Sequence, residues 1–156
     1  MSGEASTQDK PMITIFTIGF AKKSARDFFE ILRRAAVRKV VDIRRNNISQ
    51  LAGFTKRDDL AYFLEAIGGI VYEHRVELAP TKDILDAYKK KTLTWAQYEE
   101  QFLALMAERR AETRMTPGDL DHACLLCSEP KPEKCHRRLV AEYLGDRWKD
   151  VEIRHL

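Results

Sequence analysis

Apolar strands that alternate with amphipathic helices are the feature of this sequence that most restricts its fold. The first is ITIFTIGF, residues 13–20, which is rich in β-branched and aromatic residues and closes on a glycine. Four further strands are expected, over residues 39–45, 69–78, 122–129 and 151–156. Because parallel crossovers place helices on the faces of a sheet, this alternation predicts a single α/β domain. We expect a three-layer, Rossmann-like domain with a mainly parallel five-stranded sheet over residues 12–156, after a disordered tail, residues 1–11.

Capping residues mark the expected helices. Ser24, Thr55, Thr81 and Thr94 are placed as N-caps, and Gly68-Gly69 ends the second helix. Pro132 suits the first position of a helix that reaches Leu144 and stops at Gly145. The apolar stripe of residues 95–109 recurs at helical spacing and is interpreted as core rather than as a cofactor site.

Composition and charge exclude several classes of protein. The net charge of +3, from 27 Lys plus Arg against 24 Asp plus Glu, permits an anionic ligand without requiring nucleic acid. Residues 1–11 lack the apolar segment of a signal peptide, and no apolar run approaches the roughly 20 residues of a membrane span. We therefore expect a cytoplasmic protein without a membrane partner, in which the three cysteines are reduced thiols.

The expected strand order predicts where a ligand binds. In the common order 3-2-1-4-5, the first and fourth strands are neighbours at the topological switch point. The loops after Gly19 and after Cys127 would then face each other across a crevice, and each leads to a helix N-terminus that favours anions. Formal positive charge could come from Lys22 or Lys23, Arg44, and Arg137 or Arg138.

Polar side chains at the expected strand ends could carry chemistry. Asp42 and Arg44 lie on the same side of the second strand and either form a structural ion pair or leave Asp42 as a base or ribose acceptor. His74 is either a proton-transfer group of near-neutral pKa or a hydrogen-bonded histidine at a strand end. Glu129 is the most natural carboxylate to face Gly19.

The cysteines resemble a zinc motif, in which C-x-x-C is followed by Cys135-His136. Strand alternation, however, sends Cys124 and Cys127 to opposite faces of the sheet, and helix geometry separates Cys135 from His136 by about 100°. No metal site is therefore predicted, and Cys124 is expected to be a buried apolar group. Cys135, near a helix N-terminus and basic neighbours, is either an activated thiol or packed against the sheet.

Four segments together resemble one family, the domain of unknown function 488: TIGFAKKS, VVDIRRNNISQLAGFTKRDDL, ELAPT and CLLCSEPKPEKCHRRLVAEYL. The family pattern of a glycine, D-x-R and E-x5-C-H-R falls on Gly19, Asp42, Arg44, Glu129, Cys135, His136 and Arg137. Many members carry D-V-R-x-x-P-x-S-R where this chain has DIRRNNISQ, which would shift ligand contacts to Asn47, Ser49 or Gln50. The resemblance implies the α/β fold and the place of a site, and it implies no reaction.

The resulting hypothesis is a polar pocket at the strand carboxyl ends that binds or acts on a phosphorylated ligand, such as a nucleotide or an exposed nucleic-acid base. The ligand-binding candidates are Gly19, Asp42, Arg44, Asn47, Ser49 and Arg137, and the catalytic candidates are Glu129, His136, His74 and Cys135. Two alternatives stay open. One is a non-catalytic nucleic-acid-binding module, and the other is a thiol or metal protein centred on Cys127 and Cys135.

Overall fold

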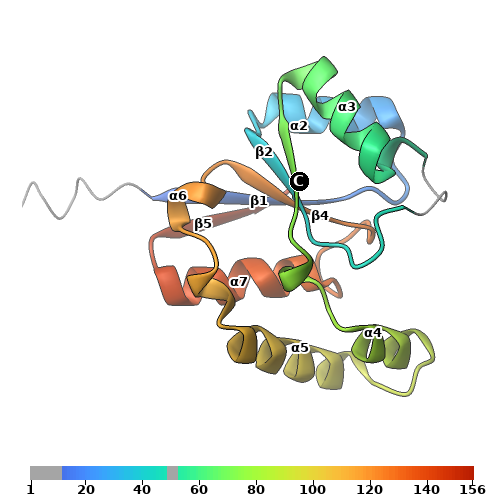
Figure 1. Ribbon diagram of the computed structural model, residues 1–156, viewed down its shortest axis with the longest axis vertical. Helices are drawn as coiled ribbons and strands as arrows, with labels where there is room; N and C mark the ends of the chain where they lie inside the picture. The colour runs from blue at the N-terminus through green and yellow to red at the C-terminus, as the bar shows by residue number, and fades with distance from the viewer. Residues whose placement is uncertain (1–11, 49–52) are drawn as a thin grey trace, which may run out of the picture.

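The computed structural model describes residues 12–48 and 53–156 of the chain. Five strands form one sheet that is parallel throughout: β1 (Ile13–Gly19), β2 (Lys39–Asp42), β3 (Val71–His74), β4 (Ala123–Cys127) and β5 (Val151–His155). Helices cover both faces of the sheet (Figure 1): α2 (Ala25–Arg34), α3 (Arg57–Gly68), α4 (Lys82–Lys89), α5 (Trp95–Arg109), α6 (Pro117–Leu120) and α7 (His136–Trp148). The prediction of a three-layer, Rossmann-like α/β fold is confirmed. Residues 1–11 and the candidates Ser49 and Gln50 lie outside the described ranges.

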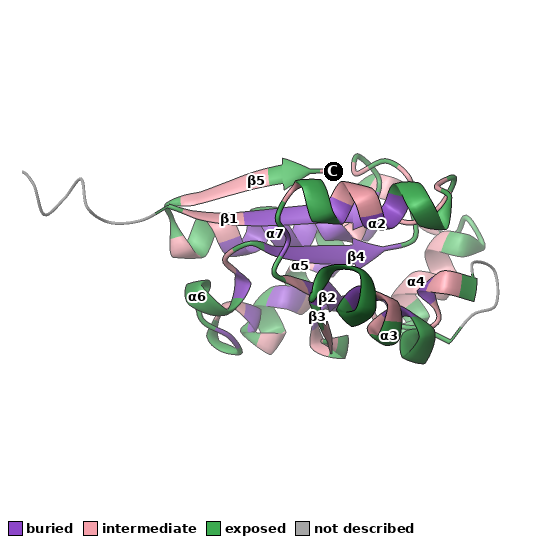
Figure 2. Ribbon diagram, turned by 90° about the horizontal axis from the view of Figure 1, so that it is seen from above, coloured by how far each residue is buried: buried purple, intermediate pink, exposed green. Residues whose placement is uncertain are grey.

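The expected strand order is wrong in one respect, since the sheet runs β3-β2-β4-β1-β5. β1 and β4 are neighbours as expected, with Gly19 opposite Cys127, but β4 also pairs with β2, with Asp42 opposite Leu126. Every residue of β4 is buried, whereas β3 and β5 are partly exposed (Figure 2). A strand that is apolar along its whole length is best placed where neighbours cover both its faces and both its edges.

Two apolar clusters separate the faces of the sheet. On one face, Phe16 and Cys124 pack with buried residues of α2 and α3. On the other, Val41 and Cys127 pack with residues of α5 and α7. The predicted separation of Cys124 from Cys127, and the burial of Cys124, are thereby confirmed. Because β4 leads to α7 while its neighbours β1 and β2 lead to α2 and α3, the switch point lies at β4.

Most predicted helix caps are present. The side chains of Ser24, Thr81 and Thr94 each accept a hydrogen bond from the backbone N–H three residues on. Gly69 ends α3 in the left-handed conformation, with φ of 61°. None of the helices in residues 12–48 and 53–156 combines the length and apolarity needed to cross a membrane.

Three predicted helix ends are wrong. Thr55 lies in the 3-10 turn η1 (Gly53–Thr55), and α3 begins at Arg57 without a side-chain cap. Pro132 belongs to the turn before α7, where its carbonyl accepts from Cys135 N–H at 3.2 Å. α7 continues past Gly145 to Trp148, whose indole N–H donates to the Glu112 carbonyl at 3.1 Å. Tertiary contacts thus override the local stop signal of a glycine.

The last residue of β1, Gly19, lies against the loop that follows β4. A Cβ atom at Gly19 would overlap the carbonyl oxygen of Glu129 and lie 2.8 Å from Nη1 of Arg137. Only glycine leaves room for the loop after β4 and for this guanidinium.

Gly19→Ala should therefore lower the free energy of unfolding by about 3 kcal/mol, because either β1 or the Glu129 loop has to move. Gly118→Ala is the matched control, since its Cβ would meet nothing closer than Thr116 Oγ1 at 3.8 Å. Urea denaturation of both variants measures the difference. Equal stability of the two variants would contradict the close approach.

Candidate functional site

A cavity of about 550 Å³ lies at the carboxyl ends of the strands, between the loop after β4 and the α4–α5 segment. Its lining comes from five parts of the chain: Phe20, Arg44, Arg45, Asn46, Pro80, Leu85, Tyr88, Lys89, Lys91, Leu93, Trp95, Tyr98, Cys127, Ser128, Glu129, Lys134, Cys135 and His136. Its position agrees with the rule that such sheets bind ligands beyond the strand carboxyl ends. Its volume is within the range of about 300–1,000 Å³ that is typical of ligand pockets.

One side of the cavity is aromatic. Trp95 and Tyr98 stack with ring centroids 5.1 Å apart and an interplanar angle of 20°, and Tyr88 lies 4.9 Å from Tyr98. The Thr94 capping box starts α5 so that Trp95 is its first residue. The interpretation of this stripe as core is confirmed for the buried Tyr98, Phe102 and Met106. Partly buried Trp95 lines the cavity, and one side of Tyr98 does so too. Burial raises the pKa of the Tyr98 hydroxyl, which stays neutral.

The charged residues of the lining are mainly basic. Glu129 is the acidic residue of the lining, and five residues are basic: Arg44, Arg45, Lys89, Lys91 and Lys134. All except Arg44 are exposed. Cys135, the N-cap of α7, is part of the same wall, which brings the positive end of that helix dipole to the cavity.

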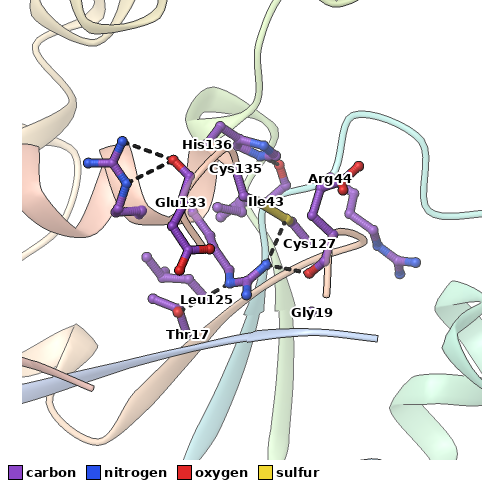
Figure 3. The surroundings of a disulfide bond; sticks show 12 residues. Thr17, Gly19, Ile43, Arg44, Leu125, Cys127, Glu133, Cys135 and His136 are labelled. Atoms are coloured by element: carbon purple, nitrogen blue, oxygen red, sulfur yellow. Dashed lines mark hydrogen bonds between the residues drawn. A yellow bond between two sulfur atoms is a disulfide. The ribbon is translucent and has the colours of Figure 1, made fainter. Parts of the chain in front are cut away.

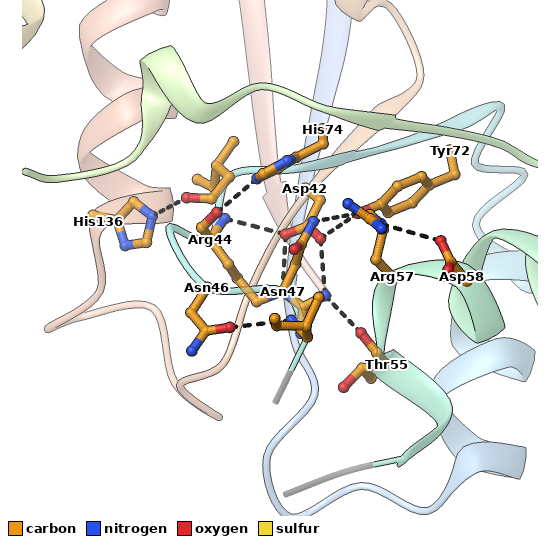
Figure 4. Close-up of polar contacts among 12 residues, drawn as sticks. Asp42, Arg44, Asn46, Asn47, Thr55, Arg57, Asp58, Tyr72, His74 and His136 are labelled. Carbon is orange, nitrogen blue, oxygen red and sulfur yellow. Dashed lines mark hydrogen bonds and ion pairs between the residues drawn. The ribbon is translucent and has the colours of Figure 1, made fainter. Parts of the chain in front are cut away.

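Asp42 and Arg44 form a buried ion pair at the end of β2 (Figure 4). Arg44 donates through Nε at 2.9 Å and Nη2 at 2.8 Å to the two carboxylate oxygens, and Nη2 also donates to the Thr55 carbonyl at 2.6 Å. The Tyr72 hydroxyl donates to Asp42 Oδ2 at 2.6 Å. Burial, and then this hydrogen bond, raise the Tyr72 pKa. Of the two alternatives for Asp42, the geometry supports the ion pair.

Asn47 and His74 brace the loop that carries Arg44. Asn47 Nδ2 donates to the Tyr72 hydroxyl oxygen at 3.1 Å. His74 Nε2 lies 2.9 Å from the Arg44 carbonyl oxygen, so this nitrogen carries the proton. Neither side chain lines the cavity. Their hydrogen bonds hold the backbone and the ion-pair partner of Arg44, which does line the cavity.

Arg137 lies behind the cavity wall and is completely buried. It donates through Nε to Thr17 Oγ1 at 3.2 Å, and through Nη1 to the Glu129 carbonyl at 2.6 Å and to Cys127 Sγ at 3.6 Å. Nη2 has no hydrogen-bond partner. Burial lowers the pKa of this guanidinium. Arg137 thus ties β1, the loop after β4 and α7 together from within.

Cys127 and Cys135 are joined by a disulfide (Figure 3), which corrects the expectation of reduced thiols for these two residues, whereas Cys124 is free as expected. The expectation that Cys135 and His136 diverge is also wrong, because Cys135 is the N-cap and lies outside the helical geometry. The two sulfurs and a ring nitrogen of His136 lie within 4.8 Å of one another. These three side chains could hold a soft metal ion after reduction, since the thiolate is the metal ligand.

His136 is oriented by a backbone carbonyl. Its Nε2 lies 2.8 Å from the Ile43 carbonyl oxygen and therefore carries the proton, which leaves Nδ1 as an acceptor. Its ring also meets the Phe102 ring edge-on at 5.6 Å. Burial lowers the His136 pKa to about 4. The ring is therefore neutral at physiological pH.

The predicted site residues thus occupy two layers. Arg44, Glu129, Cys135 and His136 line the cavity, whereas Gly19, Asp42, Asn47, His74 and Arg137 support it from behind. Sequence reasoning missed the aromatic wall and the α4–α5 lysines. The run Lys89-Lys90-Lys91 and the capped Trp95 were visible signals. No pattern tied that long β3–β4 crossover to the strand ends.

The fold and the cavity define a Rossmann-like α/β protein with a cavity of about 550 Å³ at the topological switch point. Residues 24–144, well over half of the chain, match the family model described as Domain of unknown function DUF488. The chain belongs to this family, which confirms the resemblance found in its motifs. Gly19 lies outside the matched range. Comparison with curated proteins and with solved structures found no match.

The buried ion pair gives a stability prediction. Asp42→Ala should lower the free energy of unfolding by about 3–5 kcal/mol, because it leaves the Arg44 charge buried and unpaired. Tyr72→Phe should cost about 2 kcal/mol, the value of a hydrogen bond to a charged group. Lys82→Ala, which breaks the exposed pair with Asp86, should leave stability nearly unchanged in the same urea titrations. Similar losses in all three variants would contradict the ranking.

His136 should make stability depend on pH. Between its folded pKa of about 4 and an unfolded value of about 6.5, the unfolded chain binds a proton that the folded chain does not. Stability should therefore fall as pH drops from about 6.5 to about 4, by up to about 1.4 kcal/mol per pH unit. His136→Gln should flatten this part of the profile. A His136 NMR titration midpoint near 6.5 would contradict the burial effect.

Proposed function

We propose that this protein binds a phosphorylated ligand with a planar ring, a nucleotide or an exposed nucleic-acid base, in the cavity at the strand carboxyl ends. One observation carries the proposal: an aromatic wall and a basic wall enclose the same cavity of about 550 Å³. A ligand with a ring at one end and negative charge at the other matches that division.

The aromatic wall favours a ring. Trp95 stacks on Tyr98, which in turn stacks on Phe102 with centroids 6.0 Å apart and an angle of 3°, so the wall is backed by the core. Stacking of a base on an aromatic side chain contributes about 1–3 kcal/mol in single-stranded nucleic-acid sites. A rigid wall also loses little side-chain entropy on binding.

The basic wall favours phosphate. The charge of Arg44 is already matched by Asp42, so this residue offers little to an anion. Arg45, Lys89, Lys91 and Lys134 are exposed on the lining, and the N-terminus of α7 adds its partial charge. Phosphate contacts are therefore assigned to these four side chains rather than to Arg44 and Arg137.

Proton transfer is assigned to two groups on the same lining. Glu129 presents an exposed carboxylate, and His136 presents a neutral ring whose Nδ1 accepts. An enzyme that uses them would lose turnover in Glu129→Gln and keep its ligand affinity. A protein that only binds the ligand would show no turnover, and its affinity would be unchanged in Glu129→Gln.

Fluorescence titration tests the proposal, because one of the two tryptophans lies in the cavity wall. Nucleoside monophosphates, nucleoside diphosphates and short single-stranded oligonucleotides are the probes. We expect saturable quenching that Trp95→Phe removes and Trp148→Phe, the matched control, retains. Trp95→Ala should weaken binding about tenfold. Absence of saturable binding by every probe would contradict the proposal.

Charge-reversal variants show whether the ligand binds in the cavity or elsewhere on the surface. Lys134→Glu and Lys89→Glu should each weaken binding at least tenfold, whereas Lys149→Glu, exposed and outside the lining, should have little effect. A non-catalytic surface module behaves differently. It would bind oligonucleotides with a steep dependence on salt that Trp95→Ala leaves unchanged, and that result would replace the present proposal.

A further inference from the structure

We propose that Cys127 and Cys135 form a redox-active pair, in which the reduced Cys127 is a thiolate held by Arg137, and that the pair exchanges with small thiols and disulfides that enter the cavity. This inference depends on the disulfide and on Arg137, and it does not require the phosphorylated ligand.

The first observation is the charge of Arg137. Its side chain is 0% exposed, and no carboxylate in residues 12–48 and 53–156 forms an ion pair with it. Its hydrogen bonds go to a hydroxyl, a carbonyl and a sulfur, and Nη2 is left without a partner. A buried cation is costly without an anion beside it. The disulfide form does not supply one.

Reduction supplies that anion. Cys127 Sγ lies 3.6 Å from Nη1 of Arg137, so a thiolate there would form a buried ion pair with the guanidinium. The thiolate also gains from the hydrogen bond, because a charged acceptor binds a donor more strongly than a neutral sulfur does. Reduced Cys127 is therefore stabilised by a group that the oxidised form leaves unmatched.

The second observation is the position of the pair beside the cavity. Both sulfur-bearing residues line the cavity, although only 2% of Cys127 and 3% of Cys135 is exposed, and the Cys135 side chain makes no capping hydrogen bond to α7. The third cysteine, Cys124, has different surroundings. Cys124 lies on the opposite face of the sheet, is fully buried, and has its pKa raised by that burial. Of the three cysteines, only this pair adjoins the cavity and has a sulfur within hydrogen-bond distance of a guanidinium, and basic surroundings favour the thiolate that exchange needs.

The charge of Arg137 also sets the order of steps. An incoming small thiolate attacks Cys135 Sγ, and the electrons of the S–S bond leave on Cys127 as the thiolate beside Arg137, because the better-stabilised thiolate leaves faster. A second small thiol then attacks the mixed disulfide and releases Cys135, which takes up a proton. In sum, two small thiols are oxidised to one disulfide, and the protein disulfide is reduced by two electrons.

Thiolate absorbance at 240 nm tests the ion pair. In a Cys135→Ser background, Cys127 should titrate more than one unit below the ordinary cysteine pKa of about 8.5. Arg137→Lys should keep this low midpoint, because the charge remains, and Arg137→Gln should return it to about 8.5 or higher. Cys124 is the internal control and should not titrate in this range. A midpoint at or above 8.5 with Arg137 intact would overturn the proposal.

A measurement on the unmodified chain covers the case in which Arg137→Gln does not fold. The protein is equilibrated with glutathione redox buffers at several pH values, and the reduced fraction is counted by maleimide labelling. Near pH 7.5 reduction should take up one proton, because Cys127 stays a thiolate. Uptake of two protons, or a disulfide that no thiol concentration reduces, would overturn the proposal.

Metal binding is the competing outcome. Cys127, Cys135 and His136 Nδ1 would be its donors, and Zn²⁺ alone is the probe. If the reduced protein retains one equivalent of Zn²⁺, resists oxidation to the disulfide, and loses the ion in His136→Gln, the site is a metal centre and the exchange proposal fails. Free exchange in the presence of Zn²⁺ supports the proposal.

Discussion

The guanidinium of Arg137 connects three segments at the back of the cavity. It reaches Thr17 on β1 and the Glu129 carbonyl after β4, while its own backbone belongs to α7. This arrangement depends on the missing side chain of Gly19, since a Cβ there would occupy the space of the carbonyl. The position of the Glu129 loop, which forms part of the cavity wall, therefore depends on the buried Arg137 and on Gly19. Neither residue touches the cavity itself.

The fold was predictable where local signals and burial agree. The segment ITIFTIGF is apolar on both faces, and Ser24, Thr81 and Thr94 cap helices through contacts within three residues. Strand order was not predictable from the same signals. It depends on which strand fills the centre of the sheet. That β4 is the strand buried along its whole length can be recognised only by comparing all five strands, not from its own sequence.

The candidate site was also predictable only in part. Residues at strand ends, such as Asp42 and Glu129, fall near the cavity because the carboxyl ends of parallel strands meet at one edge. Which of them faces the cavity depends on side-chain partners: Asp42 turns to Arg44 and Tyr72, and the Glu129 carboxylate stays exposed. The aromatic wall comes from the β3–β4 crossover, whose place over the sheet no local pattern encodes. The disulfide was missed because cellular compartment, not geometry, decided the expectation for the cysteines.

The central position of β4 also constrains how the protein is made. β1 pairs only with β4 and β5, and β2 reaches β1 only through β4. A growing chain that leaves the ribosome can pair β2 with β3, but β1 waits for more than a hundred residues before a partner strand emerges. Such long-range closure is slow and leaves an apolar strand edge open. The cavity therefore forms late, because its lining includes residues 127–136, and a nascent chain that ends before residue 123 lacks this wall.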